Sequence, residues 1–231
     1  MRINKFIARS GIASRRKAEQ LVLDGHIKIN GQVVYDLATR VDPKKDQVTY
    51  KDRPISPVEE KYYLMLNKPV GYTCTNEDVY AEKTIFDLID IKTKLFSIGR
   101  LDKDSSGLIL VTNDGDIYNK IMHPSSQVCK RYLVDLDKGF NRKDEVKFKQ
   151  GIDIGDYITN PAKLEYTKEK AQLYISIAEG KNRQIRRMFQ ALGYRVDGLE
   201  RLSVGEINLG NLKVGSYRRL NEKELDYLRK L

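Results

Sequence analysis

The segment KDRPISPVEE, at positions 51–60, most limits how this 231-residue chain can fold. It contains two prolines and little apolar content, and proline lacks the backbone donor that a helix interior or a central strand needs. We therefore expect a linker at 51–60. It divides the chain into a small part, 1–50, and a larger part, 61–231, each of which must build its own core.

The first part predicts two short helices followed by a hairpin. Within residues 1–24, Gly11 interrupts an apolar helical pattern, and Ser14 is a suitable N-cap for the second helix. The run HIKINGQVV then alternates around Asn30-Gly31, a strong signal for a two-residue hairpin turn. Basic residues without any acidic neighbour mark the first 17 positions: Arg2, Lys5, Arg9, Arg15, Arg16 and Lys17.

The second part mixes strands and helices without a regular alternation. Its clearest helix is 184–192, where apolar side chains recur at i, i+3, i+4 and i+7 on one face and basic ones line the other. Strands are expected at 96–98, 108–112, 131–136 and 171–177. This order favours an α+β fold over a doubly wound one.

The charge balance indicates a polyanionic partner. Lysine plus arginine number 42 against 32 acidic residues, which gives a formal net charge of +10. The excess is clustered, because the stretch Gly180–Arg195, like the first 17 positions, contains basic residues and no acidic one. Single-sign blocks within folded segments favour nucleic acid as the partner over a merely charged surface.

Several other classes are disfavoured by what the sequence lacks. The cysteines and histidines form no disulfide framework and no zinc-ligand spacing; they are Cys74, Cys129, His26 and His123. Gly180-Lys181 is followed by Asn182, so it does not complete a phosphate-binding loop. We expect no metal and no cofactor. No secretory signal or membrane-length apolar stretch is visible, so we expect a cytoplasmic protein.

The run GRLDKDSSGL, at 99–108, places a carboxylate in a polar turn. Asp102 follows the apolar approach 96–98, and the turn ends at Gly107, where the next apolar run begins. An aspartate in such a turn commonly accepts backbone N–H bonds and does nothing more. With Arg100 two residues before it, the same carboxylate could instead be a reactive group at the mouth of a cleft. The local sequence leaves both interpretations open.

The longer run GRLDKDSSGLILVTNDGD resembles the motif around the catalytic aspartate of bacterial pseudouridine synthases. The resemblance is to the RsuA-like family, which modifies ribosomal RNA, and within it to the branch that acts on large-subunit RNA. Further segments resemble the family in the same order: LNKPVGYTCT (66–75), KRYLVDLD (130–137), EGKNRQIRRMFQALGY (179–194) and LERLSVGEINLGNLKVG (199–215). The N-terminal part is similar to the alpha-L RNA-binding module of a small-subunit ribosomal protein. The resemblance implies a catalytic domain at 61–231 built on a mixed, largely antiparallel sheet.

The resemblance implies a role for three residues in the chemistry. Asp102 matches the family's essential aspartate, Tyr132 the tyrosine that stacks on the target base, and Arg186 the basic residue that forms an ion pair with the aspartate. Arg183 stands where many relatives have histidine, so we expect of it only a phosphate contact. The expected RNA-binding residues are Arg2, Lys5, Arg9, Arg15, Arg16, Lys17, Arg100, Arg183 and Arg187.

The implied reaction fits these residue types. It breaks the N1–C1′ bond of uridine, rotates the base and rejoins it through C5, after the nucleotide has been swung out of the RNA. Tyr132 would replace the lost stacking. Asp102 must be ionised, and it acts either at C1′ as a nucleophile or at C2′ as a base. The sequence does not decide between these two routes, and neither needs a cofactor.

We therefore expect a monomeric enzyme that isomerises a specific uridine in ribosomal RNA, most simply large-subunit 23S RNA, in a stem-loop or an assembling subunit. Small-subunit 16S RNA and tRNA are alternative substrates. A protein of another class, a non-catalytic RNA-binding assembly factor with the same fold, is also compatible with the sequence. A DNA-reading helix-turn-helix within 1–24 is disfavoured, because a hairpin follows the second helix where a third helix is expected.

Overall fold

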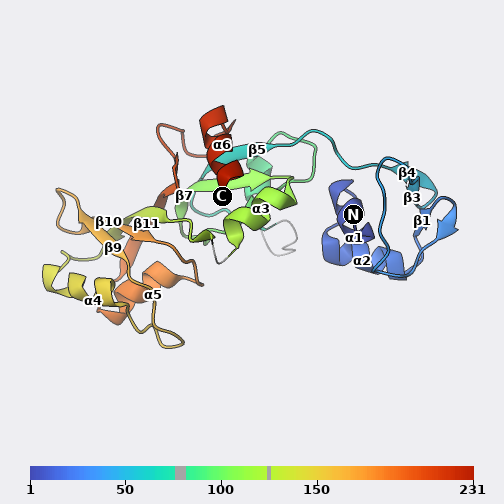
Figure 1. The fold of residues 1–231 in the computed structure, drawn as a ribbon. Helices are drawn as coiled ribbons and strands as arrows, with labels where there is room; N and C mark the ends of the chain where they lie inside the picture. The colour runs from blue at the N-terminus through green and yellow to red at the C-terminus, as the bar shows by residue number, and fades with distance from the viewer. Residues whose placement is uncertain (76–81, 124–125) are drawn as a thin grey trace. The chain divides into compact units, whose positions relative to one another are not determined.

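The computed structural model describes residues 1–75, 82–123 and 126–231, which form two compact units (Figure 1). One unit consists of Met1–Lys61 with the short stretch Ile91–Lys94, and the other of Tyr62–Asp90 with Leu95–Leu231. Each unit has its own sheet. None of the helices in the described ranges combines the length and the apolar character needed to cross a membrane.

The N-terminal unit packs two helices with a four-stranded antiparallel sheet of order β2-β1-β3-β4. Its elements are α1 (Ile3–Arg9), α2 (Arg15–Leu23), β1 (Ile27–Ile29), β2 (Gln32–Val33), β3 (Val48–Tyr50) and β4 (Arg53–Ile55). Apolar residues of both helices, among them Ile3, Phe6 and Val22, are buried with Ile27 and Val48 of the sheet. The unit therefore has a hydrophobic core of its own.

Local sequence signals set the boundaries of these first elements. The Ser14 side chain accepts a hydrogen bond from the backbone N–H of Lys17 at 3.4 Å and so caps α2. Asn30 and Gly31 both have positive φ, 50° and 84°. That conformation is the one required at both central residues of a type I′ hairpin turn, and it joins β1 to β2. The predicted helix pair and hairpin are confirmed.

The expectation that 51–60 is entirely a linker is wrong in its first half. Arg53–Ile55 forms strand β4, whose Pro54 is paired with Thr49 of β3. A proline is tolerated here because β4 is the edge strand of its sheet, so one side of it needs no ladder donors. Residues 56–62 have no regular secondary structure.

The larger unit is built on a nine-stranded sheet in the described residues, with the main order β13-β5-β7-β11-β8-β10-β9. Among the described strand pairs, β7 and β11 run parallel and the others antiparallel. The strands are β5 (Tyr63–Lys68), β6 (Phe96–Ile98), β7 (Ser106–Thr112), β8 (Lys130–Leu136), β9 (Lys163–Tyr166), β10 (Gln172–Ile177), β11 (Val196–Val204), β12 (Ile207–Asn208) and β13 (Tyr217–Arg219). The α+β class and the mixed, largely antiparallel sheet are confirmed.

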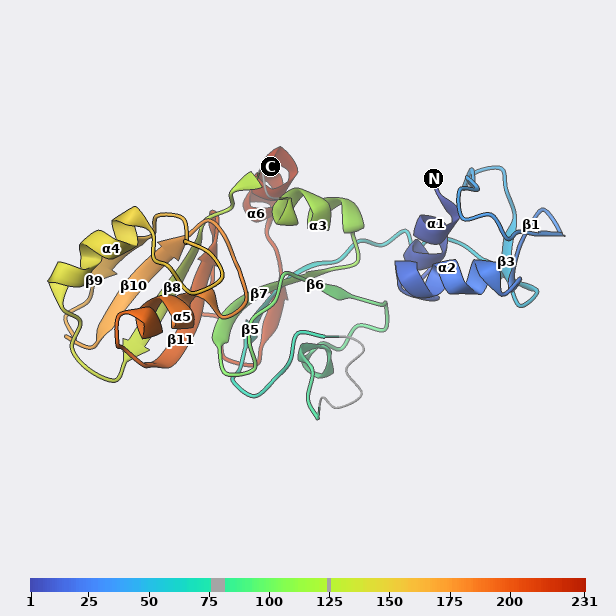
Figure 2. The same ribbon diagram turned by 90° about the horizontal axis from the view of Figure 1, so that it is seen from below.

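Helices flank this sheet. They are α3 (Gly115–Met122), α4 (Glu145–Gln150), α5 (Gln184–Ala191) and α6 (Glu222–Lys230), with two described 3₁₀ turns at Ile85–Leu88 and Arg142–Asp144. Figure 2 shows α3 and α6 side by side, next to β5 and β7. Helix α5 packs on β11. It buries Ile185, Met188 and Phe189, the apolar stripe that the sequence predicted.

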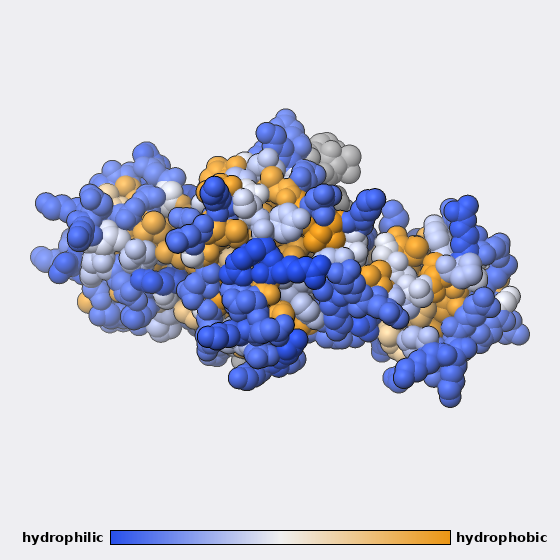
Figure 3. All heavy atoms as spheres, turned by 90° about the horizontal axis from the view of Figure 1, so that it is seen from above, coloured by the Kyte–Doolittle hydropathy of each residue, from blue (hydrophilic) through white to orange (hydrophobic). Residues whose placement is uncertain are grey.

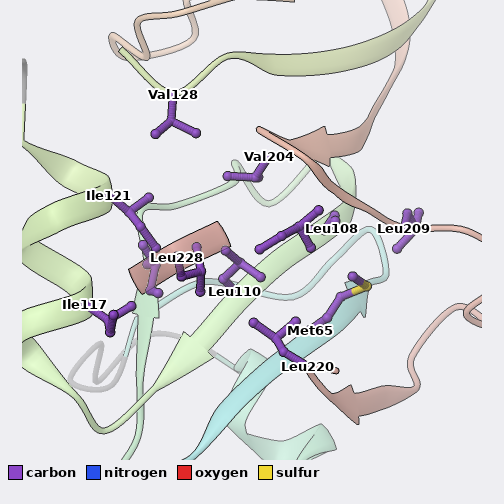
Figure 4. Packing of buried hydrophobic residues seen from close by; sticks show 12 residues of the cluster. Met65, Leu108, Leu110, Ile117, Ile121, Val128, Val204, Leu209, Leu220 and Leu228 are labelled. Atoms are coloured by element: carbon purple, nitrogen blue, oxygen red, sulfur yellow. The ribbon is translucent and has the colours of Figure 1, made fainter. Parts of the chain in front are cut away.

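One hydrophobic core of this unit lies between the first strands and the helices α3 and α6 (Figure 4). Met65 of β5 and Leu108 and Leu110 of β7 pack there with Ile121 of α3 and Leu228 of α6. Side chains alternate between the two faces of a strand, so the residues next to Leu108 and Leu110 point to the opposite face. That opposite face is where the candidate site lies.

The surface agrees with the charged composition. Figure 3 shows hydrophilic side chains over much of the visible face, with hydrophobic ones distributed between them. The few large apolar side chains that are strongly exposed include Val70, Ile158 and Val214. Isolated apolar residues of this kind are normal on the surface of a folded protein and need no partner to explain them.

Candidate active site

Asp102 lies at the start of a turn that leads into the buried strand β7. The backbone N–H of Ser105 donates to the carbonyl of Asp102 at 3.1 Å, which closes a four-residue turn. The Asp102 side chain is 33 % exposed, whereas Leu101 before it and Ser105 after it are buried. The carboxylate is thus held on a fixed backbone and still open to solvent, as a group that reacts with a ligand must be.

Residues 66–74 hold this turn in place. The Nζ of the buried Lys68 donates to the Ser105 carbonyl at 2.6 Å, and the N–H of Gly71 donates to the Lys103 carbonyl at 2.7 Å. The N–H of Leu101 donates to Sγ of Cys74 at 3.4 Å. Burial lowers the pKa of the Lys68 ammonium. The turn around Asp102 is therefore anchored by bonds from a distant part of the chain.

Four residues on four neighbouring strands share one row across the sheet. Lys68 pairs with Gly107, Gly107 with Arg201, and Arg201 with Tyr132, across strands β5, β7, β11 and β8. Paired residues point to the same face. Two strand spacings separate Gly107 from Tyr132, roughly 10 Å between backbones. The register therefore places Tyr132 on the same face as Lys68, two strands from the one that follows the Asp102 turn.

Arg201 is a buried cation in the middle of this row. Its side chain is only 4 % exposed, and its Nε donates to the carbonyl of Leu108 at 2.6 Å. Its Nη2 has no hydrogen-bond partner among the described atoms. Within the described residues, neither Arg201 nor Lys68 forms an ion pair with a carboxylate. A buried positive charge is costly unless it is paired and hydrogen-bonded, and here backbone carbonyls supply the described hydrogen bonds of both cations.

Arg183 approaches Asp102 from the start of helix α5. It is the N-cap residue, with a positive φ of 47°, a conformation that side-chain-bearing residues seldom adopt. Its Nη1 lies 3.7 Å from Oδ2 of Asp102. The same guanidinium donates to both oxygens of Asp104, at 3.1 and 2.9 Å. These bonds lower the pKa of the Asp104 carboxyl.

The expected ion pair between Arg186 and Asp102 is not the one that the structure forms. Nη2 of Arg186 donates to the backbone carbonyl of Asp104 at 2.8 Å, and Nη1 donates to the carbonyl of Val196 at 2.7 Å. Its Nε lies 3.3 Å from Oδ2 of Asp104. Arg186 stands one turn further along α5 than Arg183, so it reaches the far end of the turn. The guanidinium beside Asp102 belongs to Arg183.

The other expected site residues fall into separate groups. Tyr132 is 6 % exposed and lies in β8. Arg187 is bound to the carboxylate of Asp156 and to the Ile154 carbonyl, so it faces a different loop from the one at Asp102. Arg100 is exposed beside the turn. The expected RNA contacts of the first 17 positions belong to the N-terminal unit, where Arg2, Arg15, Arg16 and Lys17 are exposed and Lys5 and Arg9 are half-buried.

Sequence reasoning missed Lys68, Arg201 and Asp104. A usable signal was present for Lys68 alone, because it is a charged residue at the end of the mainly apolar strand YLMLNK, whereas Arg201 lies in VDGLERLSV among other charged residues. Charged side chains in such positions are seldom buried unless they are paired, so they are candidates for a structural or functional role. Asp104 carried no comparable signal, since an exposed aspartate in a turn is common.

The fold and the exposed, anchored carboxylate are compatible with an RNA-modifying enzyme, and comparison with known families identifies the class. The chain belongs to the RNA pseudouridylate synthase family, whose model matches residues 62–191, and an S4 domain matches residues 1–48. It is therefore an RNA pseudouridine synthase, an isomerase, joined to an RNA-binding module.

Known proteins resemble the chain along its whole length. An uncharacterized RNA pseudouridine synthase from Aquifex aeolicus is 39 % identical over 233 residues, which cover 99 % of this chain and 93 % of that protein. The ribosomal large subunit pseudouridine synthase B of Bacillus subtilis is 39 % identical, covering 100 % and 96 %. The dual-specificity RNA pseudouridine synthase RluF of Escherichia coli is 37 % identical, covering 100 % and 79 %. A crystal structure of a pseudouridylate synthase matches with a TM-score of 0.72 and 35 % identity over 99 % of both chains.

Proposed function

We propose that this enzyme isomerises a specific uridine of large-subunit ribosomal RNA, with Asp102 as the residue that acts on the ribose. The observation that carries the assignment is the state of Asp102. Its carboxylate is one-third exposed, its turn is fixed by Lys68 and Gly71, and a guanidinium lies 3.7 Å away. A carboxylate so held can meet the sugar of an everted nucleotide without first reorganising its backbone.

The neighbouring cations suit this role. Arg183 lies against the Asp102 carboxylate, and Lys68 and Arg201 add positive charge from the sheet below. An ionised Asp102 is required both for attack at C1′ and for removal of a proton at C2′. The arrangement therefore supports either route.

Tyr132 is proposed as the platform for the target base. It lies two strands from β7 in the same row as Gly107, so a base held over this row is flanked by the ring on one side and by the Asp102 turn on the other. The ring is almost covered in the free protein. We infer that side chains above it move aside when the nucleotide enters. The phenol could then replace the stacking that the base loses on leaving the RNA.

The N-terminal module, expected at 1–50 and extended by β4, is proposed to hold RNA phosphates. The first turn of α2 carries Arg15, Arg16 and Lys17 and no acidic residue. Cations at a helix N-terminus are unfavourable for the helix itself, because the peptide dipoles already place positive charge there. The same combination of dipole, free N–H groups and basic side chains is favourable for a phosphate group.

Large-subunit RNA is the preferred substrate because one relative that matches the whole of this chain carries that substrate in its name, and because ribosomal RNA offers accessible bases in loops. Small-subunit RNA and tRNA are the alternatives, and the name of the dual-specificity relative is a reason to test more than one RNA. We propose that the enzyme works as a monomer, in the cytoplasm, where ribosomal subunits are assembled.

The test is a comparison of cells with and without the gene. Pseudouridines are mapped across large-subunit RNA, small-subunit RNA and tRNA from both strains, and from a deletion strain that carries Asp102→Asn. One or more sites in large-subunit RNA should be lost in the deletion and stay unmodified with Asp102→Asn. Loss confined to small-subunit RNA or tRNA would reassign the substrate. If Asp102→Asn restored the missing sites, the chain would act as an assembly factor and not as the catalyst.

A further inference from the structure

One carboxylate in the site serves two arginines and satisfies only one of them. Asp104 accepts two hydrogen bonds from Arg183, one on each oxygen. Arg186 lies against the same group, with its Nε 3.3 Å from Oδ2. That Nε is buried and makes no hydrogen bond with any described atom. The buried donor of Arg186 therefore lies close to an oxygen that is already hydrogen-bonded to Arg183, without forming a hydrogen bond of its own.

The two arginines differ in how firmly they are held. Two backbone carbonyls, those of Val196 and Asp104, fix the ends of the Arg186 guanidinium, and its side chain is 12 % exposed. The Arg183 side chain is 46 % exposed, and among the described residues both its carboxylate partners, Asp102 and Asp104, belong to one turn. Exposed ion pairs contribute little to stability. Arg183 is thus the arginine whose ion pair with Asp104 can be broken at a small cost in free energy.

A phosphate group is a suitable replacement for Asp104. A carboxylate that binds an arginine through two parallel hydrogen bonds presents the same pair of oxygens as a phosphate does. The Asp104–Arg183 pair lies beside Asp102, where the backbone of a bound RNA must pass if the ribose reaches that carboxylate. An RNA phosphate would then find the Arg183 guanidinium already oriented for two parallel hydrogen bonds by its pairing with Asp104.

We propose that Asp104 is a positioning residue: it binds Arg183 in the free enzyme, and on RNA binding Arg183 leaves Asp104 and pairs with an RNA phosphate. The released carboxylate then accepts the hydrogen bond from Nε of Arg186. This exchange leaves both arginines hydrogen-bonded, and it adds a side-chain hydrogen bond to the backbone bond by which Arg186 already joins helix α5 to the turn that carries Asp102. The inference rests on the proposed approach of the RNA ribose to Asp102.

The exchange predicts opposite effects of Asp104 on binding and on turnover. Asp104→Asn removes the anion that competes for Arg183, so RNA affinity should rise, roughly 1.5- to 5-fold. The amide is a weaker acceptor for Arg186, so the single-turnover rate of pseudouridine formation should fall, roughly 10- to 100-fold. A residue that only supports the fold would lower both quantities together, or neither.

The matched control is Asp156→Asn. Asp156 is also an exposed aspartate paired with an arginine of α5, Arg187, and its replacement changes the net charge by the same amount. Binding is measured with a labelled large-subunit ribosomal RNA transcript, and turnover with total RNA from cells that lack the gene. Asp156→Asn should leave the rate unchanged and affect binding less than Asp104→Asn does. Equal effects of the two variants on affinity, with unchanged rates, would overturn the proposal.

Two further arms separate this inference from the proposed function. In an Arg183→Gln background, Asp104→Asn should no longer raise the RNA affinity, because the arginine that would pair with the phosphate is missing. If Asp104→Asn raised the RNA affinity as much in this background as in the wild type, the proposed exchange would be contradicted. The binding arm is repeated with Asp102→Asn, so it does not depend on catalysis. Melting curves of all variants identify any that fail to fold. If wild-type enzyme forms no pseudouridine in any of these RNAs, the proposed function fails, whatever the binding arm reports.

Discussion

Gly107 and Arg201 face each other across the parallel strands β7 and β11 with almost no space between them. A Cβ atom on Gly107 would collide with the carbonyl oxygen of Arg201 and lie 2.6 Å from its backbone N, and Gly107 also has a φ of +99°. We predict that Gly107→Ala lowers the free energy of unfolding by about 2–4 kcal/mol, because neither backbone can move away without breaking the pairing. Gly115→Ala in α3 is the control, since nothing lies within 4 Å of its added Cβ. Chemical denaturation of both variants checks this.

Asp102→Asn should abolish pseudouridine formation and leave RNA binding intact. The amide cannot attack C1′ or remove a proton at C2′, so a rate loss of about 10³-fold or more is expected. The side chain is one-third exposed and its ion pair with Arg183 is long, at 3.7 Å, so the melting temperature should change little. Single-turnover assays and filter binding on one preparation measure both effects. Product at the wild-type rate would exclude Asp102 as the catalyst.

Replacements of Tyr132 should separate the ring from its hydroxyl. Tyr132→Phe keeps the aromatic platform, so RNA binding should stay close to wild type. Tyr132→Ala removes stacking on the target base, which is worth roughly a 5- to 150-fold change in affinity for an everted nucleotide. The same change empties a buried position, so the alanine variant must be compared at a temperature well below its own melting point. Equal affinity of the two variants would argue against a stacking role.

Lys68 should make stability depend on pH in the alkaline range. Burial lowers the pKa of its ammonium in the folded state below the value in the unfolded chain. The folded protein therefore loses this proton first, and between the two pKa values the unfolded state binds more protons, so the contribution of Lys68 to the free energy of unfolding rises with pH. In denaturation series from about pH 8 to pH 11, the free energy of unfolding of the wild type minus that of Lys68→Met should therefore rise. A difference that is constant or falls would contradict the burial of a charged Lys68.

The basic first turn of α2 should control the salt dependence of RNA binding. Joint replacement of Arg15, Arg16 and Lys17 by glutamine should weaken binding and reduce the slope of log affinity against log salt by roughly 0.7–0.9 for each phosphate that the variant no longer binds. The choice of uridine should not change, because phosphate contacts orient the RNA without reading bases. Lys223→Gln in α6 serves as a control for the removal of one exposed positive charge. An unchanged salt slope in the triple variant would remove these residues from the RNA interface.

The elements that could be predicted from sequence are those specified by neighbouring residues. The Ser14 cap, the Asn30-Gly31 turn and the apolar stripe of α5 each depend on side chains within one or two turns of chain. The sheet order could not be predicted in this way. Strand β11, late in the chain, lies between β7 and β8, and its own sequence does not specify which strands it pairs with.

In the candidate site, too, only the features specified by neighbouring residues could be predicted from sequence. The position of Asp102 in a turn before a buried strand follows from local sequence, and its importance followed from the resemblance. The partners of that turn did not, because Lys68 and Arg183 reach it from 34 and 81 residues away in sequence, and their contacts exist only once the sheet has formed. For the same reason the contact of both Arg183 and Arg186 with Asp104 could be seen only in the structure.

The proposed catalysis requires the correct strand register, because the register is what aligns Lys68, Gly107, Arg201 and Tyr132 in one row. If β8 slipped by a single residue against β11, Leu133 would take the place of the phenol and the ring would turn to the other side of the sheet. Such a misaligned protein could keep its secondary structure and still be inactive. Enzymatic turnover is thus a more sensitive gauge of correct strand alignment in this chain than any spectrum of its backbone.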